Sequence, residues 1–216
     1  MRRLSILEGA GPLRVLALGA HADDIEIGCG GTLLRLAARE GPLDVTWVVF
    51  AATPERAAEA RGSAAAFLRG AATTRVLVGQ HRDAYLPYAG AALKDEFEAL
   101  KREVAPDVVF THFREDRHQD HRLVSELTWN TWRNHLILEY EIPKYDGDTG
   151  APNVFSPLPA ATVERKTALV LEHFASQVGR QWFTADLLRA AMRIRGMECA
   201  SESGFAEGFT CRKAVF

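Results

Sequence analysis

The chain has 216 residues, of which 47% are hydrophobic and 25% charged, and its formal net charge is -2. These values are ordinary for a soluble globular protein, so we predict one domain over residues 1–216, with no general electrostatic attraction to nucleic acid or an anionic membrane. No segment approaches the roughly 18 apolar residues of a membrane span, none resembles a signal peptide, and the cysteines lack CxxC spacing; we therefore expect a cytoplasmic protein with reduced thiols.

In the first half of the chain, apolar runs alternate with helical patterns. Short apolar runs without polar alternation are typical of buried parallel strands, and they span residues 15–20, 45–51 and 108–111, with 75–78 as a weaker fourth candidate. Helical patterns cover residues 32–38, 54–68 and 94–104. This alternation predicts an α/β fold, a three-layer sandwich with a mostly parallel sheet.

The second half of the chain has a different pattern. Residues 125–138 look helical, and residues 142–153 are rich in turn formers and predict a long ordered loop. Two further helices are predicted over 161–173 and 184–195. The C-terminal residues 209–216 are expected to close the sheet as an edge strand.

A run of polar residues follows the first predicted strand, where a ligand crevice is expected in an open α/β sheet. His21 and Asp24 are three residues apart, so one turn of backbone can aim both at a common point, and an imidazole with a carboxylate suits zinc or ferrous iron. Asp23 lies between them and is placed to hold a metal-bound water. Alternatively, these acids only favour the start of the next helix, and at this point both interpretations stay open.

A second cluster follows the strand predicted at 108–111. His112, His118 and His121 lie within ten residues, in a chain with 7 histidines in all, and Asp120 stands beside the last of them. Because the carboxyl ends of parallel strands face one crevice, the two clusters are expected to converge. Together they favour a metal site over coincidence.

The two clusters resemble the signature motifs of a known family. His-Ala-Asp-Asp-Ile-Glu at 21–26 and His-Gln-Asp-His at 118–121 are similar to the AHPDDE and HxDH motifs of the PIG-L/LmbE-like N-deacetylases. The resemblance implies a Rossmann-like fold, a zinc ion (or Fe²⁺ or another divalent metal), and removal of an N-acetyl group from an N-acetylglucosamine-type sugar or glycoconjugate. It also implies a small-molecule partner and allows a homo-oligomer.

The resemblance further implies roles for individual residues. They are metal ligation by His21, Asp24 and His121, general base catalysis by Asp23, oxyanion stabilisation or acid catalysis by His118, and orientation of a neighbouring histidine by Asp120. Arg56 matches a substrate-contacting arginine approximately, although it is equally suited to pair with Glu59 one helical turn away, and Asp83 resembles an aspartate near the sugar hydroxyls. Ala22 replaces the usual proline, and Glu26 stands one residue beyond the motif's glutamate, so no role transfers to it.

Two other classes of protein compete with this interpretation. A non-haem iron oxygenase also uses two histidines and one carboxylate, but normally on an all-β barrel with His-x-Asp spacing. A non-catalytic metal- or nucleotide-binding module predicts no hydrolysis, and the glycines at 28–31 do not form a GxGxxG motif.

Overall fold

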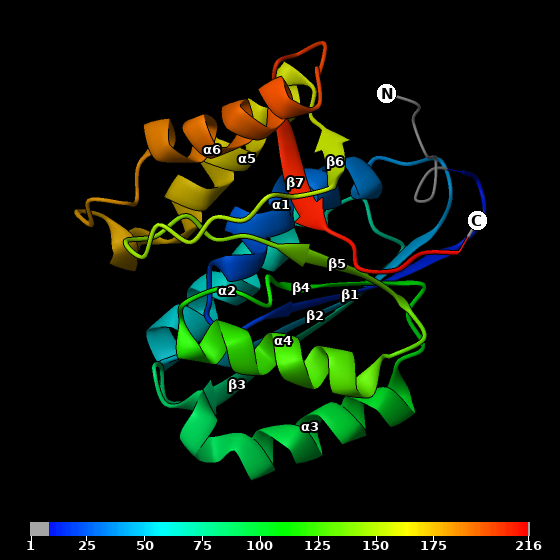
Figure 1. The fold of residues 1–216 in the computed structure, drawn as a ribbon, viewed down its shortest axis with the longest axis vertical. Coiled ribbons are helices and arrows are strands. Elements are labelled where there is room, and N and C mark those ends of the chain that lie inside the picture. Colours follow the sequence, from blue (N-terminus) through cyan, green and yellow to red (C-terminus); the bar gives the residue numbers. More distant parts are fainter. Residues whose placement is uncertain (1–8, 216) are drawn as a thin grey trace.

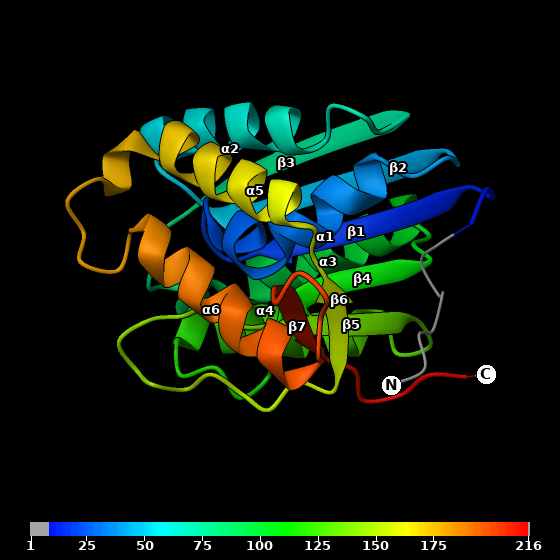
Figure 2. The ribbon, with the colours of Figure 1, turned by 90° about the horizontal axis from the view of Figure 1, so that it is seen from above.

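The computed structural model describes residues 9–215, which contain one seven-stranded sheet with strand order β3-β2-β1-β4-β5-β7-β6 (Figures 1 and 2). The strands are β1 (Leu13–Gly19), β2 (Leu43–Ala51), β3 (Thr73–His81), β4 (Val108–His112), β5 (Leu136–Tyr140), β6 (Val154–Pro157) and β7 (Ala206–Thr210). β1 to β5 run parallel, and β7 runs antiparallel to both of its neighbours. The prediction of an α/β fold with a mostly parallel sheet is confirmed.

Helices cover both faces of this sheet and complete the three layers. They are α1 (Asp24–Ala37), α2 (Pro54–Phe67), α3 (Gly90–Glu103), α4 (Gln119–Thr131), α5 (Ala160–His173) and α6 (Ala185–Glu198), with short 3-10 turns η1 (Leu86–Ala89) and η2 (Ala175–Gln177). α1, α2, α5 and α6 lie on one face, and α3 and α4 lie on the other (Figures 1 and 2). Among residues 9–215, none of the helices has the length and hydropathy needed to cross a bilayer.

The central strand β1 supplies side chains to two separate cores. Val15 and Ala17 pack in the core under α1, α2 and α5, while Leu16 and Leu18 pack in the core under α3 and α4. Because successive side chains of a strand point to opposite faces, a strand covered on both faces needs apolar residues at every position. This is why the sequence of β1 shows an unbroken apolar run.

Two predictions for the second half of the chain were wrong. The predicted helix over 125–138 combines α4, which ends at Thr131, with the start of β5 at Leu136. β5 is held by parallel pairing with β4 and antiparallel pairing with β7, contacts that local periodicity does not reveal. The strand expected at 209–216 overlaps β7 (Ala206–Thr210) only at residues 209–210; residues 211–215 form no strand, and residue 216 lies outside the described residues. β7 also lies inside the sheet, and the edge strand beside it is β6.

The first helix begins well before the predicted start at Thr32, since α1 opens at Asp24 and continues through the glycine cluster. These glycines allow close packing: a Cβ on Gly28 would lie 2.1 Å from Cδ2 of Tyr140, and one on Gly30 would lie 2.7 Å from Cε1 of Phe67. The polar motif therefore spans the end of β1 and the first turn of α1. β1 lies between β2 and β4, where the strand order reverses, so the motif faces the crevice in which such sheets bind ligands.

Candidate metal centre

The first motif is arranged by the tight connection from β1 to α1. The backbone N–H of His21 donates to Oδ2 of Asp24 at 2.6 Å, which fixes the carboxylate at the helix start, and Asp23 is the N-cap residue. Asp23 and Asp24 are only 6% and 3% exposed, so both carboxylates lie within the protein rather than on its surface. Acids that only favoured a helix N-terminus would be expected to face solvent.

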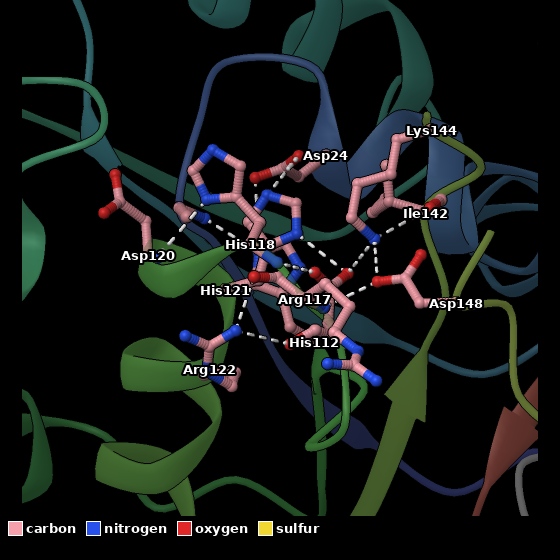
Figure 3. Close-up of polar contacts among 12 residues, drawn as sticks. Asp24, His112, Arg117, His118, Asp120, His121, Arg122, Ile142, Lys144 and Asp148 are labelled. Carbon is pink, nitrogen blue, oxygen red and sulfur yellow. Dashed lines mark hydrogen bonds and ion pairs between the residues drawn. The ribbon is translucent and has the colours of Figure 1, made fainter. Parts of the chain in front are cut away.

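The second motif occupies the connection from β4 to α4. His118 is the N-cap of α4, and its Nδ1 accepts a hydrogen bond from the N–H of Asp120 at 3.2 Å. Asp120 and His121 follow in the first turn and are buried. The ring of His118 stacks on that of His121 with centroids 4.5 Å apart, so the two predicted histidines of this motif face the same space (Figure 3).

The two motifs bring the three predicted ligands together. Nε2 of His121 lies 3.2 Å from Nδ1 of His21 and 3.5 Å from Oδ1 of Asp24, and Nδ1 of His21 lies 3.4 Å from Oδ2 of Asp24. Tetrahedral zinc with bonds of about 2.0–2.1 Å separates its ligand atoms by about 3.3–3.4 Å. The two histidines thus contact different oxygens of Asp24, and each of the three contacts is close to the spacing that zinc requires between two of its ligand atoms.

The other nitrogen of each histidine is bound to a carboxylate. Nε2 of His21 lies 3.1 Å from Oδ2 of Asp120 and 2.9 Å from Oδ1 of Asp83, and Nδ1 of His121 lies 3.0 Å from Oδ2 of Asp116. Since carboxylates accept, these nitrogens carry a proton, and the opposite nitrogen of each ring faces the common point, where a metal would bind it in its unprotonated form. This is the arrangement found around metal-binding histidines, and Asp120 contacts His21.

Sequence reasoning gave no role to Asp116, although it precedes the second motif by only two residues. Burial disfavours its charged form, but hydrogen bonds from His121 and Lys144 outweigh burial and hold the pKa of this carboxyl well below its usual range. Asp116 is thus ionised and orients His121. An acid just before a HxDH motif was the available signal, but its partner could not be chosen from spacing alone.

His112 was noted in the sequence but assigned no role, and the structure places it beside the ligands. Its Nε2 accepts from the N–H of Ala20 at 3.0 Å and lies 3.2 Å from Oδ2 of Asp24. With one donor atom taken from each side chain, three sets of described residues lie close enough to share an ion. They are Asp24, His112 and His121; His21, His118 and His121; and His21, Asp83 and Asp120. The position of His112 at the carboxyl end of β4 was the feature of the sequence that could have indicated a place in this centre.

Asp23 is held by Arg56, which projects from the first turn of α2. Nη2 of Arg56 lies 2.9 Å from Oδ2 of Asp23, and Nη1 lies 2.9 Å from Oε2 of Glu59. Burial raises the pKa of Asp23, and the ion pair with Arg56 opposes this rise without cancelling it. The expected i, i+3 pair with Glu59 is thus present, and Arg56 also contacts the predicted base.

The remaining predicted residues lie at the rim or beneath the centre. Asp83 has a side chain that is 76% exposed, so it stands at the entrance while contacting His21. Glu26 is fully buried within α1, and burial raises its pKa to about 8.

The fold and the site together are those of an α/β enzyme with its active centre at the switch point of a parallel sheet. A family model described as PIG-L, GlcNAc-PI de-N-acetylase, matches residues 16–132. The uncharacterised deacetylase YaiS of Escherichia coli K12 is 32% identical over 144 residues, which cover 60% of this chain and 74% of YaiS. The chain belongs to the PIG-L family, and it is a hydrolytic N-deacetylase.

Solved structures share the fold at lower identity. The N,N′-diacetylchitobiose deacetylase of Pyrococcus horikoshii matches with a TM-score of 0.70 and 22% identity, over 92% of this chain and 83% of that one. GalB of Pseudomonas putida KT2440, a 4-carboxy-2-hydroxymuconate hydratase, matches with a TM-score of 0.74 and 15% identity, over 94% of this chain and 98% of GalB. The same fold thus carries more than one reaction, so the substrate must be argued from the site.

Proposed function

We propose that the chain removes the N-acetyl group from N-acetylglucosamine-type sugars by using a divalent ion, Zn²⁺ in first place, held by His21, Asp24 and His121. The observation that carries this proposal is the convergence of these side chains: Nδ1 of His21 and Nε2 of His121 lie 3.2 Å apart, and they lie 3.4 and 3.5 Å from Oδ2 and Oδ1 of Asp24, respectively. When bound, such an ion polarises a carbonyl and makes water more acidic. The fold shared with a diacetylchitobiose deacetylase supports an N-acetylated sugar as the substrate.

Asp23 is the proposed general base. It is adjacent in sequence to the ligand Asp24, and its buried carboxylate has a raised pKa, which brings it closer to the neutral pH at which a base is effective. Arg56 fixes the orientation of this carboxylate through Oδ2. Asp23 takes one proton from the attacking water and returns it to the amide nitrogen of the tetrahedral intermediate as the C–N bond breaks, so that the amine leaves in neutral form.

His118 is proposed to stabilise the oxyanion that forms from the acetyl carbonyl. Its Nδ1 accepts the N–H of Asp120, so Nε2 carries the proton in the neutral ring. A neutral His118 can therefore donate a hydrogen bond to the oxyanion, and the imidazolium form is not required. Burial and the neighbouring His121 lower the pKa of His118, which agrees with this neutral role.

Substrate recognition is proposed to involve the exposed carboxylate of Asp83 at the entrance. Its contact with Nε2 of His21 fixes one oxygen, and its exposure leaves it accessible to the hydroxyl groups of a sugar. Arg56 is only 16% exposed and is engaged by two carboxylates, so we assign it mainly to holding Asp23.

The proposal is tested by loading purified protein with Zn²⁺ and measuring free amine and acetate released from N-acetylglucosamine, N,N′-diacetylchitobiose and N-acetylglucosaminyl inositol. We expect one amine for each acetate. Asp23→Asn should still bind Zn²⁺ but lose about 100-fold or more in kcat. Asp107→Asn, which alters an exposed pair with Arg14, is the matched control and should keep full activity.

Two results would overturn the proposal. Absence of amine release from every sugar, with Zn²⁺ bound, would remove the sugar deacetylase assignment. Oxygen consumption by the Fe²⁺-loaded protein without amine release would instead favour the oxygenase alternative. Unchanged kcat in Asp23→Asn would refute the role of this residue alone.

A further inference from the structure

Asp116 links a proposed metal ligand, His121, to a lysine from a distant segment, Lys144. Its Oδ1 accepts the N–H of His118 at 2.7 Å, and its Oδ2 is shared between Nδ1 of His121 at 3.0 Å and Nζ of Lys144 at 2.9 Å. The carboxylate oxygen that orients His121 is therefore also paired with a full positive charge. Neither the resemblance nor the deacetylase reaction requires such a cation.

Lys144 is held in this position by its surroundings. Its side chain is 14% exposed, and its ammonium also pairs with Oδ2 of Asp148 at 2.5 Å. Asp148 accepts the N–H of Arg117 at 2.6 Å, which joins the segment after β5 to the one that precedes α4. Keeping a lysine in one rotamer costs entropy, and the contacts with Asp116 and Asp148 offset this cost. Lys144 is therefore held at the centre and is not a mobile surface charge.

The two ends of the segment that carries Lys144 are fixed independently of Lys144 itself. Arg195 on α6 binds Oε1 and Oε2 of Glu141 at 2.6 and 2.8 Å and the carbonyl of Gly150 at 3.0 Å. The segment from 141 to 150 is therefore anchored at both ends, and Lys144 reaches from it to Asp116. Loss of the lysine charge need not release the segment.

The electrostatic effect of Lys144 has a definite sign. An ionised Asp116 makes His121 a stronger electron donor to a metal, because its hydrogen bond with the N–H at Nδ1 increases the basicity of the opposite ring nitrogen, Nε2. The ammonium of Lys144 on the same oxygen reduces this increase in basicity, and its positive charge also repels a nearby divalent ion. Both effects lower the affinity of the centre for the metal.

We propose that Lys144 is a positioning residue that acts through Asp116 on His121 and restrains the metal affinity of the centre, so that the ion withdraws more electron density from the substrate carbonyl. This inference rests on the proposed metal site but not on the identity of the sugar. Restrained donation by the ligands leaves the ion a stronger Lewis acid.

The test measures the affinity of metal-free protein for Zn²⁺ by competition with a chelator, at one fixed pH for all variants. Lys144→Met should bind Zn²⁺ roughly threefold or more tightly, while turnover falls. Lys144→Arg keeps the charge, so its affinity for Zn²⁺ and its turnover should both equal those of the wild-type protein. Lys94→Met, which removes an exposed lysine paired with Glu98 on α3, is the control for net charge and should leave both unchanged.

Asp148→Asn provides the opposite perturbation, because it removes the second partner of Lys144 and should weaken Zn²⁺ binding. Weaker or unchanged binding in a folded Lys144→Met protein would overturn the proposal, as would failure of Lys144→Arg to restore it. If Lys144→Met does not fold, unchanged binding in Asp148→Asn would overturn it. Wild-type protein that binds Zn²⁺ but releases no amine would refute the proposed sugar reaction and leave the affinity comparison valid.

Discussion

A buried ion pair ties the helix that carries Asp24 to the rest of the fold. Lys166 on α5 and Glu207 on β7 are 2% and 4% exposed, and Nζ lies 2.7 Å from Oε1. Lys166 also donates to the carbonyl of Ile27, while Glu207 accepts the N–H of Gly31, two groups that bond to each other in a regular helix. The ion pair thus binds one carbonyl and one N–H of the α1 backbone and holds this helix in place.

Removal of one partner leaves the other charge buried. We predict that Lys166→Met lowers the free energy of unfolding by about 3–5 kcal/mol. In a domain of this size, that corresponds to a fall in Tm of about 10 °C. Glu207→Gln should cost a similar amount, since it leaves the ammonium of Lys166 without a counter-charge.

The double variant separates the ion pair from simple packing. In Lys166→Met/Glu207→Gln no unpaired charge remains, and the amide oxygen still accepts from α1, so the loss should be at least about 2 kcal/mol smaller than the sum of the single losses. Urea unfolding of the four proteins measures this coupling. Lys94→Met is the surface control and should change stability by less than about 1 kcal/mol. Additive losses, or a loss below about 1 kcal/mol in Lys166→Met, would refute the reasoning.

Three further predictions concern the centre and its support. Asp116→Asn should weaken Zn²⁺ binding about 10- to 100-fold, because His121 loses its anionic partner, and chelator competition checks this. A strong chelator should abolish amine release and lower Tm, and added Zn²⁺ should restore both; activity that survives complete removal of the metal would contradict the proposed mechanism. Gly28→Ala should cost about 1–3 kcal/mol in a denaturant melt, since its Cβ would lie 2.1 Å from Tyr140, whereas Gly11→Ala meets nothing within 4 Å and should be nearly neutral.

The parts of the fold that could be predicted are those whose signal is local. The run at 15–20 indicated β1 because both faces of that strand are covered, and α5 was placed within a residue of its observed start at Ala160. β5 was missed because Leu136–Tyr140 directly follows a helix and resembles its continuation, while its identity as a strand depends on pairing with β4 and β7. Such pairing joins segments far apart in the chain, and helical periodicity carries no information about it.

The same distinction applies to the candidate site. The metal ligands were predicted from two motifs with characteristic spacing, each directly after a strand, and the structure brings His21 and His121 within 3.2 Å of each other. The contact of Lys144 with Asp116 had no such signal, because Lys144 lies in a turn-rich segment whose path is set by Arg195 on α6. The sequence showed Asp116 next to the second motif but gave no indication of its partners, His121 and Lys144.

This difference follows from how the two sets of residues work. His21 and Asp24 can face one point because they are one turn of backbone apart, whereas their combination with the distant His121 was implied by the resemblance to the two family motifs. The charge that acts on Asp116 needs only to lie near one oxygen, and a lysine on any neighbouring segment can provide it. In the role that we propose for Lys144, the affinity of the centre is adjusted by a contact that the motifs do not contain, and the comparison of Lys144→Met with Lys144→Arg therefore tests something that no motif could predict.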